Sequence, residues 1–302
     1  MGRIAEALKK AEHQRAQKQA DAESPAPANR LANLPPAENE LPDPTEGPGL
    51  APPVVSKRAP RVQGLSESLV PYYEPSSVIS EQYRGLRTRL LNQNPDNEHR
   101  IIGITSGAPR DGKSVTAANT AFILSEIRHL KVLVVDGDFR RSSLGGMLNM
   151  PKSPGLADVL RGEATYEEAM RETPIPNLSF MPAGDIQDRS AAEILSDEKT
   201  GSIFARFQRE FHYTIVDTPP ATTVTDVGII GQWCNGVIMV VRINRTPEPI
   251  AQRAVRVLQV NNVPILGVLL VGNEARAPGY GYYRYYNYYR SYYTRDDDKH
   301  RR

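Results

Sequence analysis

Six runs of apolar residues recur along the middle of the chain, and within each run the apolar positions are mostly continuous rather than alternating. They predict strands at 100–105, 131–136, 178–182, 213–217, 236–242 and 264–270. Continuous apolar runs are typical of strands buried on both faces of a parallel sheet. The segments between them carry apolar residues at helical spacing, and predict helices at 78–92, 113–128, 155–161, 190–210 and 247–261. The alternation predicts an α/β fold with a doubly wound, mostly parallel sheet, whose sites lie at the carboxyl ends of the strands.

The two ends of the chain lack this alternation. Ten of the 25 prolines fall between residues 21 and 60, and such a segment cannot bury enough apolar surface to offset its ordering entropy. Before it, Ile4, Leu8 and Ala11 form one helical stripe among charged residues, as in a solvated helix or in one that docks on a partner. We therefore predict four segments: an amphipathic helix at 1–20, a disordered Pro-rich linker at 21–76, a packed domain at 77–275 and a flexible tail at 276–302.

Charge and composition exclude several classes of protein. The formal net charge of the 302 residues is +2, so bulk charge does not indicate nucleic-acid binding and no nucleic-acid partner is expected. The one cysteine, Cys234, excludes a disulfide scaffold and a Cys-based zinc site. No apolar run approaches the roughly 20 residues of a membrane span, and the first residues lack the apolar core of a signal peptide. We expect a soluble cytoplasmic protein.

The strongest motif lies between the first expected strand and the helix that follows it. It reads Gly-Ala-Pro-Arg-Asp-Gly-Lys-Ser and fits the phosphate-binding pattern G-x-x-x-x-G-K-S, known as Walker A. In such a loop, backbone N–H groups surround phosphate oxygens at a helix N-terminus, the lysine reaches the terminal phosphates and the hydroxyl binds Mg²⁺. The motif predicts an ATP site formed by Gly107, Ala108, Pro109, Arg110, Asp111, Gly112, Lys113, Ser114 and Val115.

Carboxylates follow two other expected strands. Asp136 and Asp138 come directly after the run that begins at residue 131, and Asp217 ends the run that begins at residue 213. Carboxylates that point into a crevice beside phosphates are costly to bury unless they meet a cation. Mg²⁺ supplies that cation, and an aspartate beside it can accept a proton from an incoming hydroxyl. Taken alone, the first pair also fits a surface turn.

The tail is rich in tyrosine. Nine of the 14 tyrosines of the chain are Tyr280, Tyr282, Tyr283, Tyr285, Tyr286, Tyr288, Tyr289, Tyr292 and Tyr293. Residues 276–302 carry a net charge of +4, and their glycines and arginines give neither helical nor strand burial. Alone, the segment fits a sticky aromatic tail or one that stacks on single-stranded nucleic acid. Attached to an ATP site, it favours a set of phosphoacceptors.

These motifs together resemble the bacterial tyrosine autokinases of exopolysaccharide and capsule biosynthesis, in their stand-alone form. The resemblance runs from about residue 77 to the C-terminus, and it covers the Walker A loop and the tyrosine cluster. The family's variant A′ motif, D-x-D-x-R, corresponds to Asp136, Asp138 and Arg140, and its Walker B motif corresponds to Asp217 with Pro220. The family's E-x-x-R-x-x-R helix corresponds to Glu81, Arg84 and Arg87, which without the other motifs would be an ordinary charged helix face.

The resemblance implies a function and a set of partners. It implies an ATP-dependent protein-tyrosine autokinase that phosphorylates C-terminal tyrosines in trans within a homo-oligomeric ring joined by Glu81, Arg84 and Arg87. It also implies control of polysaccharide polymerisation and export, with a separate membrane co-polymerase or activator that holds the chain at the inner face of the membrane, and a tyrosine phosphatase.

The resemblance also implies roles within the site. Lys113 would bind the terminal phosphates, Ser114, Asp138 and Asp217 would bind Mg²⁺ directly or through water, and Asp136 is the candidate proton acceptor, although its role and that of Asp138 could be exchanged. Two other functions remain open. A partition-type ATPase switch would carry a lysine after the first Walker A glycine, where this chain has Ala108. A catalytically silent adaptor would have the same motifs.

Overall fold

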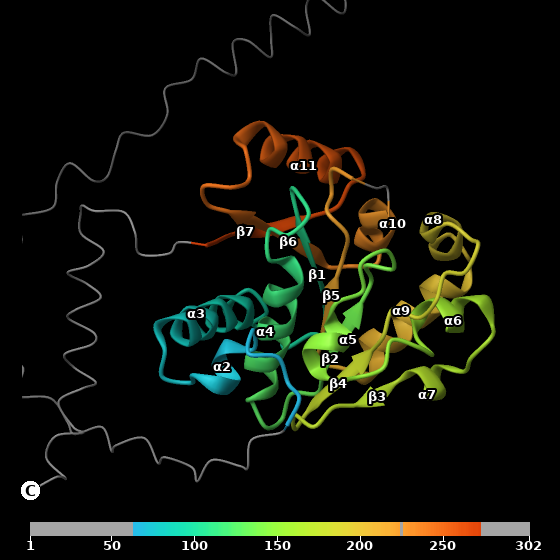
Figure 1. Ribbon diagram of the computed structural model, residues 1–302, viewed down its shortest axis with the longest axis horizontal. Helices are drawn as coiled ribbons and strands as arrows, with labels where there is room; N and C mark the ends of the chain where they lie inside the picture. Colours follow the sequence, from blue (N-terminus) through green and yellow to red (C-terminus); the bar gives the residue numbers. More distant parts are fainter. Residues whose placement is uncertain (1–62, 224–225, 273–302) are drawn as a thin grey trace, which may run out of the picture. The chain divides into compact units, whose positions relative to one another are not determined.

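The computed structural model describes residues 63–223 and 226–272 (Figure 1). The amphipathic helix expected at 1–20 and the tyrosine-rich tail lie outside the described residues. Everything described belongs to one compact unit of the chain, Pro60–Arg302. In the part of the chain that the structure describes, no helix is long and apolar enough to span a bilayer.

One sheet organises the described residues. It has seven strands in the order β3-β4-β2-β5-β1-β6-β7. All of the neighbouring strands are parallel except the two-residue β3, which is antiparallel to β4. The bounds are β1 Arg100–Ser106, β2 Val132–Asp136, β3 Arg171–Glu172, β4 Leu178–Met181, β5 Tyr213–Asp217, β6 Gly236–Arg242 and β7 Ile265–Val271. The predicted mostly parallel sheet is confirmed, and β3 is an addition to it.

Helices cover both faces of this sheet (Figure 1). Their bounds are α2 Val70–Tyr73, α3 Val78–Asn92, α4 Lys113–Ser125, α5 Leu144–Leu148, α6 Leu156–Arg161, α7 Tyr166–Ala169, α8 Ala191–Leu195, α9 Lys199–Glu210, α10 Asp226–Gln232 and α11 Glu248–Val260. The single helix expected at 190–210 is wrong. Asp197 interrupts it, because its side chain accepts a hydrogen bond of 2.8 Å from the N–H of Lys199 and so begins a second helix.

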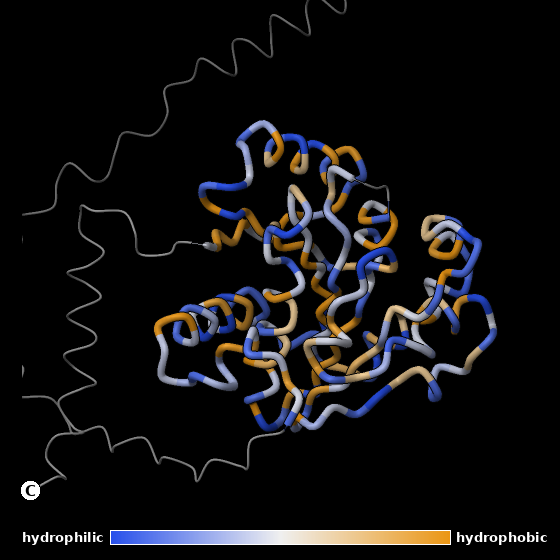
Figure 2. Tube along the Cα trace, in the orientation of Figure 1, coloured by the Kyte–Doolittle hydropathy of each residue, from blue (hydrophilic) through white to orange (hydrophobic). Residues whose placement is uncertain are grey.

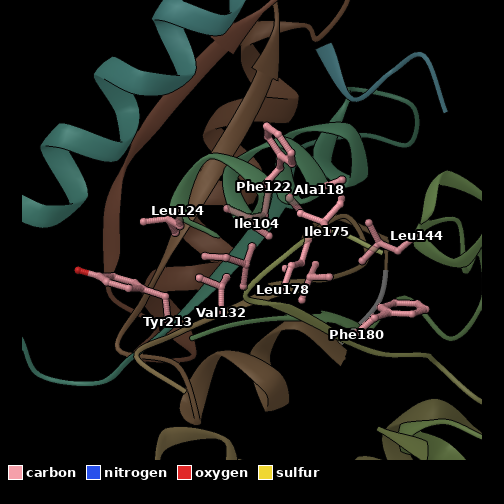
Figure 3. Close-up of a cluster of buried hydrophobic side chains, with 14 of the residues drawn as sticks. Ile104, Ala118, Phe122, Leu124, Val132, Leu144, Ile175, Leu178, Phe180 and Tyr213 are labelled. Atoms are coloured by element: carbon pink, nitrogen blue, oxygen red, sulfur yellow. The ribbon is translucent and has the colours of Figure 1, made fainter. Parts of the chain in front are cut away.

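Successive strand residues alternate between the cores on the two faces of the sheet. Ile102 and Ile104 of β1 pack in the core beneath α2–α5, whereas Ile101 packs in the core beneath α6–α9. Figure 3 shows the first of these cores, where Ala118 and Phe122 of α4 face side chains of the strands. In Figure 2 the hydrophobic colour concentrates along the central strands and the helix faces that meet them. Burial on both faces explains why the strand sequences are apolar without alternation.

The packed domain begins earlier than residue 77. Leu65 and Leu69, which the sequence analysis placed in the linker, are 5% and 0% exposed and belong to the core beneath α4. The N–H of Ser66 donates to the carbonyl of Met147 at 2.9 Å, which ties this segment to the rest of the domain. Two leucines four residues apart are too few to establish a helical pattern, so this extension of the domain could not be predicted.

Candidate active site

The Walker A loop joins β1 to α4 at the carboxyl edge of the sheet. Gly112 adopts the left-handed conformation, with φ of 101°, directly before the first residue of α4. The loop closes on itself through the buried side chain of Asp111, whose Oδ2 accepts a hydrogen bond of 2.8 Å from the N–H of Ala108. The N–H groups of the first turn of α4 have no partners within the helix, as at every helix N-terminus. They can therefore bind an anion such as a phosphate.

Lys113 lies among carboxylates. Its Nζ is 2.8 Å from Oδ2 of Asp138, 3.3 Å from Oδ1 of Asp217 and 3.1 Å from Oγ of Ser114. The lysine is only 7% exposed. Burial opposes its charge, but Asp217 and Asp138 outweigh that effect and hold the pKa of Lys113 above its usual value. The ammonium group is therefore charged at neutral pH and can exchange its carboxylate partners for phosphate oxygens.

Asp136 is held by three donors. Its Oδ2 accepts from Oγ of Ser142 at 2.9 Å and from the N–H of Leu144 at 3.2 Å, and its Oδ1 accepts from the N–H of Asp138 at 3.3 Å. The carboxyl group is fully buried. Burial raises the pKa of Asp136 above its usual value, although the hydrogen bonds from Ser142 and Leu144 lower it. A raised pKa moves this group toward the range in which a carboxylate is an effective general base.

Asp217 stands opposite Asp136 in the strand register. Its carboxyl is fully buried, and burial raises its pKa to about 7 although Lys113 lowers it. Between the two strands, the N–H of Gly137 donates to the carbonyl oxygen of Asp217 at 2.8 Å. A Cβ on Gly137 would lie 2.9 Å from that oxygen, so this approach requires glycine. The strand register thus places Asp136 of the A′ motif beside Asp217 of the Walker B motif.

The donor set fits a magnesium ion. Asp138 and Asp217 pair with the ammonium of Lys113, and Asp136 stands opposite Asp217 in the strand register, so three buried carboxyl groups lie near the start of α4 with one lysine among them. Carboxylate and hydroxyl oxygens are the ligands that Mg²⁺ prefers, usually one or two of them together with water and phosphate oxygens. Within the described residues no three His, Cys, Asp or Glu side chains form a ready metal cage.

Asp226 is a residue of the site that sequence reasoning missed. It begins α10 and is 2% exposed, and its Oδ2 lies 3.5 Å from Nε of Arg140, in the A′ motif. Its Oδ1 has no hydrogen-bond partner within the part of the chain that the structure describes. The available signal was an acidic residue at the start of a helix soon after Pro219-Pro220. The pair fixes the guanidinium of Arg140, whose side chain is half-exposed, to the start of α10.

The residues expected to join subunits lie together on α3, apart from the carboxylates. Arg84 pairs with Glu81 on the same helix. Arg87 donates to the carbonyl of Ile123 at 2.9 Å and pairs with Glu126 at 3.0 Å, so both its partners belong to the end of α4 or the residue after it. Their role in assembly stays a prediction. The nine tail tyrosines lie outside the described residues.

Comparisons with known proteins agree with this geometry. The family model ParA, described as NUBPL iron-transfer P-loop NTPase, matches residues 97–276, more than half of the chain. The tyrosine-protein kinase YwqD of Bacillus subtilis is 29% identical over 227 residues, which cover 75% of this chain and 95% of that protein. The tyrosine-protein kinase CpsD of Streptococcus agalactiae is 28% identical over 204 residues, which cover 67% of this chain and 87% of that one.

A solved structure is also similar to this chain. The crystal structure of the chimerical protein CapA2B2 superposes with a TM-score of 0.64 at 30% identity, over 68% of this chain and 89% of that one. The predicted fold class and the predicted family resemblance are both confirmed. The chain therefore belongs to the ParA type of P-loop NTPases, a nucleotide-binding family, and within it to the bacterial tyrosine kinases.

Proposed function

We propose that the chain is an ATP-dependent protein-tyrosine kinase that phosphorylates the tail tyrosines of a neighbouring copy within a homo-oligomer. The observation that carries the proposal is the position of Lys113. Its ammonium lies at the start of α4 between Asp138 and Asp217, so residues of the Walker A, A′ and B motifs are in direct contact there. A phosphate bound at the N-terminus of α4 would meet all three.

Each of these residues would have its own role in the transfer of the phosphoryl group. The loop N–H groups and Lys113 would hold the phosphates of ATP, and Arg140 lies where it can bind an anionic group at the mouth of the site. The phenolic oxygen of the tyrosine would bond to the γ-phosphorus as the bond to the oxygen of ADP breaks. The phenolic proton would go to Asp136, whose raised pKa suits a proton acceptor.

Ser114, Asp138 and Asp217 would hold Mg²⁺, directly or through water. When bound, the ion would neutralise phosphate charge that develops during the transfer. Lys113 can release the two carboxylates for this task, because its ammonium gains phosphate oxygens in exchange. The ammonium of Lys113 thus lies between Asp138 and Asp217, where the proposed ligand set requires a cation.

The wider role follows from the family to which the chain belongs. We propose that the kinase controls polymerisation and export of an exopolysaccharide or capsule. It would act at the inner face of the membrane through a separate co-polymerase or activator, and a tyrosine phosphatase would restore the unmodified tail.

The ParA match also fits a second function, a nucleotide-dependent switch without kinase activity. In partition-type switches a lysine follows the first Walker A glycine and reaches across the dimer. Ala108 occupies that position here and cannot do so.

One experiment tests the kinase. The purified full chain is incubated with ATP and Mg²⁺, and phosphopeptides are resolved by mass spectrometry. We expect phosphate on residues between Tyr280 and Tyr293, and none on the Lys113→Met variant. Lys152→Met, which changes an exposed lysine, is the matched control and should behave as the unaltered chain. ATP hydrolysis without any phosphotyrosine would reject the kinase and favour the switch.

A mixing experiment tests transfer in trans. A Lys113→Met chain with an intact tail is mixed with an active chain whose nine tail tyrosines are phenylalanine. Phosphate on the Lys113→Met tail is the expected result, because only a neighbour could supply it. If that tail stays unmodified while the unaltered chain phosphorylates itself, transfer occurs within one chain.

A further inference from the structure

The edge strand β7 has an uncovered apolar face. β7 is parallel to β6, with Met239 opposite Val268 and Val241 opposite Leu270. Residues that stand opposite each other in a sheet point to the same face, so Val268 and Leu270 share the face of Met239, which is the face that α11 covers. They are nevertheless 52% and 62% exposed. The helix therefore covers β6 and leaves this side of β7 open.

A cavity lies on the same face of the sheet, and one of its lining residues, Met239, is the register partner of Val268. Ala254 and Leu258 of α11 are fully buried against β6, while the next stripe around the helix borders an open cavity of about 360 Å³. The lining residues are Met239, Glu248, Ala251, Gln252, Val255 and Arg256. We call this cavity, together with Val268 and Leu270, the α11–β7 groove. Its floor is apolar, and its rim carries the carboxylate of Glu248, the amide of Gln252 and the guanidinium of Arg256.

The chain itself continues from the end of this groove. After Val271 comes Gly272, whose φ of 79° is a left-handed conformation that turns the chain at the end of the strand. The first tail tyrosine, Tyr280, is eight residues further on. Eight residues can span about 26 Å, whereas a seven-residue strand is about 23 Å long. Tyrosines of the tail can therefore reach any part of the groove from the end of β7.

The chemistry of the tail matches the chemistry of the groove. A tyrosine has an apolar ring and one polar tip, so it binds best where an apolar floor meets a polar rim. Val268 and Leu270 offer such a floor, and Glu248 and Gln252 offer acceptors for phenolic hydroxyls. Neighbouring apolar side chains that are exposed on one face mark interaction sites.

We propose that the α11–β7 groove binds the unmodified tyrosine-rich tail of the same chain. The tail then has a resting place on its own domain, away from the active site of a neighbour. The docking itself requires no kinase activity. It can therefore be tested independently of the proposed function.

The test measures competition for the groove. A fluorescein-labelled peptide of residues 273–293 is titrated with the full chain and with a full chain whose nine tail tyrosines are serine, and its fluorescence anisotropy is followed. We expect the peptide to bind the serine variant about tenfold more tightly, because the tail of the unaltered chain occupies its own groove. Equal affinities for the two chains would overturn the proposal, and so would the absence of binding to both.

A second pair of variants locates the binding site. In the serine-tail chain, Val268→Ser with Leu270→Ser should weaken peptide binding by about tenfold, since the apolar floor is lost. Both side chains are exposed, so the changes leave the core intact. Val260→Ser, an exposed valine at the end of α11, is the matched control and should bind unchanged. An unaltered affinity in the double variant would place the peptide elsewhere and reject the groove.

Peptide binding measured at several protein concentrations shows whether the docked tail belongs to the same chain or to a second copy. A tail bound within its own chain excludes the peptide to the same degree at every protein concentration. If exclusion appears only as the concentration of the unaltered chain rises, the tail occupies the groove of a second copy, and the proposal of docking within one chain is wrong.

Discussion

The hydroxyl of Ser142 donates a hydrogen bond of 2.9 Å to Oδ2 of Asp136, the carboxylate to which we assign the phenolic proton. The bond stabilises the charged form of a fully buried group. It therefore lowers the pKa of Asp136, which burial raises. Two opposed effects thus set the pH at which Asp136 can accept a proton.

Ser142→Ala should move the pH dependence of autophosphorylation. Without this donor the pKa of Asp136 rises further, and the group becomes protonated at a higher pH. Because a proton acceptor must be ionised, activity should begin to fall at a higher pH than in the unaltered chain as the solution is acidified. The measurement is the initial rate of phosphotyrosine formation against pH. Ser143→Ala is the control, since that side chain makes no capping bond; an unshifted profile in Ser142→Ala would mean that Asp136 is not the acceptor.

Lys113→Met should change how stability depends on pH. The pKa of Asp217 is about 7 in the folded chain, against 3.8 as the ordinary value. Between these values the folded state binds more protons than the unfolded state, so the free energy of unfolding falls as pH rises, and the fall ends near pH 7. Lys113 lowers the pKa of Asp217, and without it the fall should continue to higher pH.

Urea unfolding of the nucleotide-free chain from about pH 5 to about pH 9 measures this effect. Lys152→Met serves as the control for loss of a lysine. Parallel curves for the Lys113→Met and unaltered chains would show that Lys113 does not control the protonation of Asp217.

Leu69→Ala should destabilise the domain by about 2–5 kcal/mol, because the side chain is fully buried in the core beneath α4. Glu67→Ala, two residues earlier and exposed, should change stability by less than about 0.5 kcal/mol. Urea unfolding of both variants gives the comparison. If the Leu69→Ala and Glu67→Ala variants have equal stability, the segment around Leu69 is part of the linker and not of the packed domain.

Replacement of Glu81, Arg84 and Arg87 by alanine should lower the oligomer mass of the unphosphorylated chain and its autophosphorylation at fixed concentration. The expectation rests on a cross-subunit role for these groups. Arg89→Ala, an exposed arginine of the same helix, is the control. Sedimentation velocity measures the mass, and an identical species in the triple variant and the unaltered chain rejects this interface.

Glu126 provides a sharper form of the same test. It lies 3.0 Å from Nη1 of Arg87 and 3.9 Å from Nε of Arg84, so it binds both arginines within one chain. Glu126→Gln should release them and raise the fraction of assembled chains at a given concentration. A lower fraction would show that these intrachain pairs support assembly.

The convergence of the site motifs could be predicted because it depends on strand direction alone. Continuous apolar runs indicated parallel strands, and Ser106, Asp136 and Asp217 end three strands that lie side by side. In a parallel sheet the carboxyl ends of neighbouring strands share one edge. The Walker A motif then identified the loop that begins at Gly107 as a further part of the site.

Other features depend on contacts between distant residues, which no local pattern contains. Asp226 joins the site only because it reaches Arg140 across the crevice. α5 and α7 are five and four residues long and so are too short for a hydrophobic period. Lys113 could be assigned to a ligand from its motif, but its pairing with Asp138 and Asp217 follows from the excess of buried carboxylates.

The close approach at Gly137 joins the backbone of the A′ motif directly to that of the Walker B motif. The backbone after β2 is bonded to the end of β5 at 2.8 Å, and not even a methyl group fits between them. Asp136 and Asp217 cannot move apart unless this backbone bond breaks. The distance between the two carboxyl groups is therefore set by the sheet and does not depend on the loops that surround them.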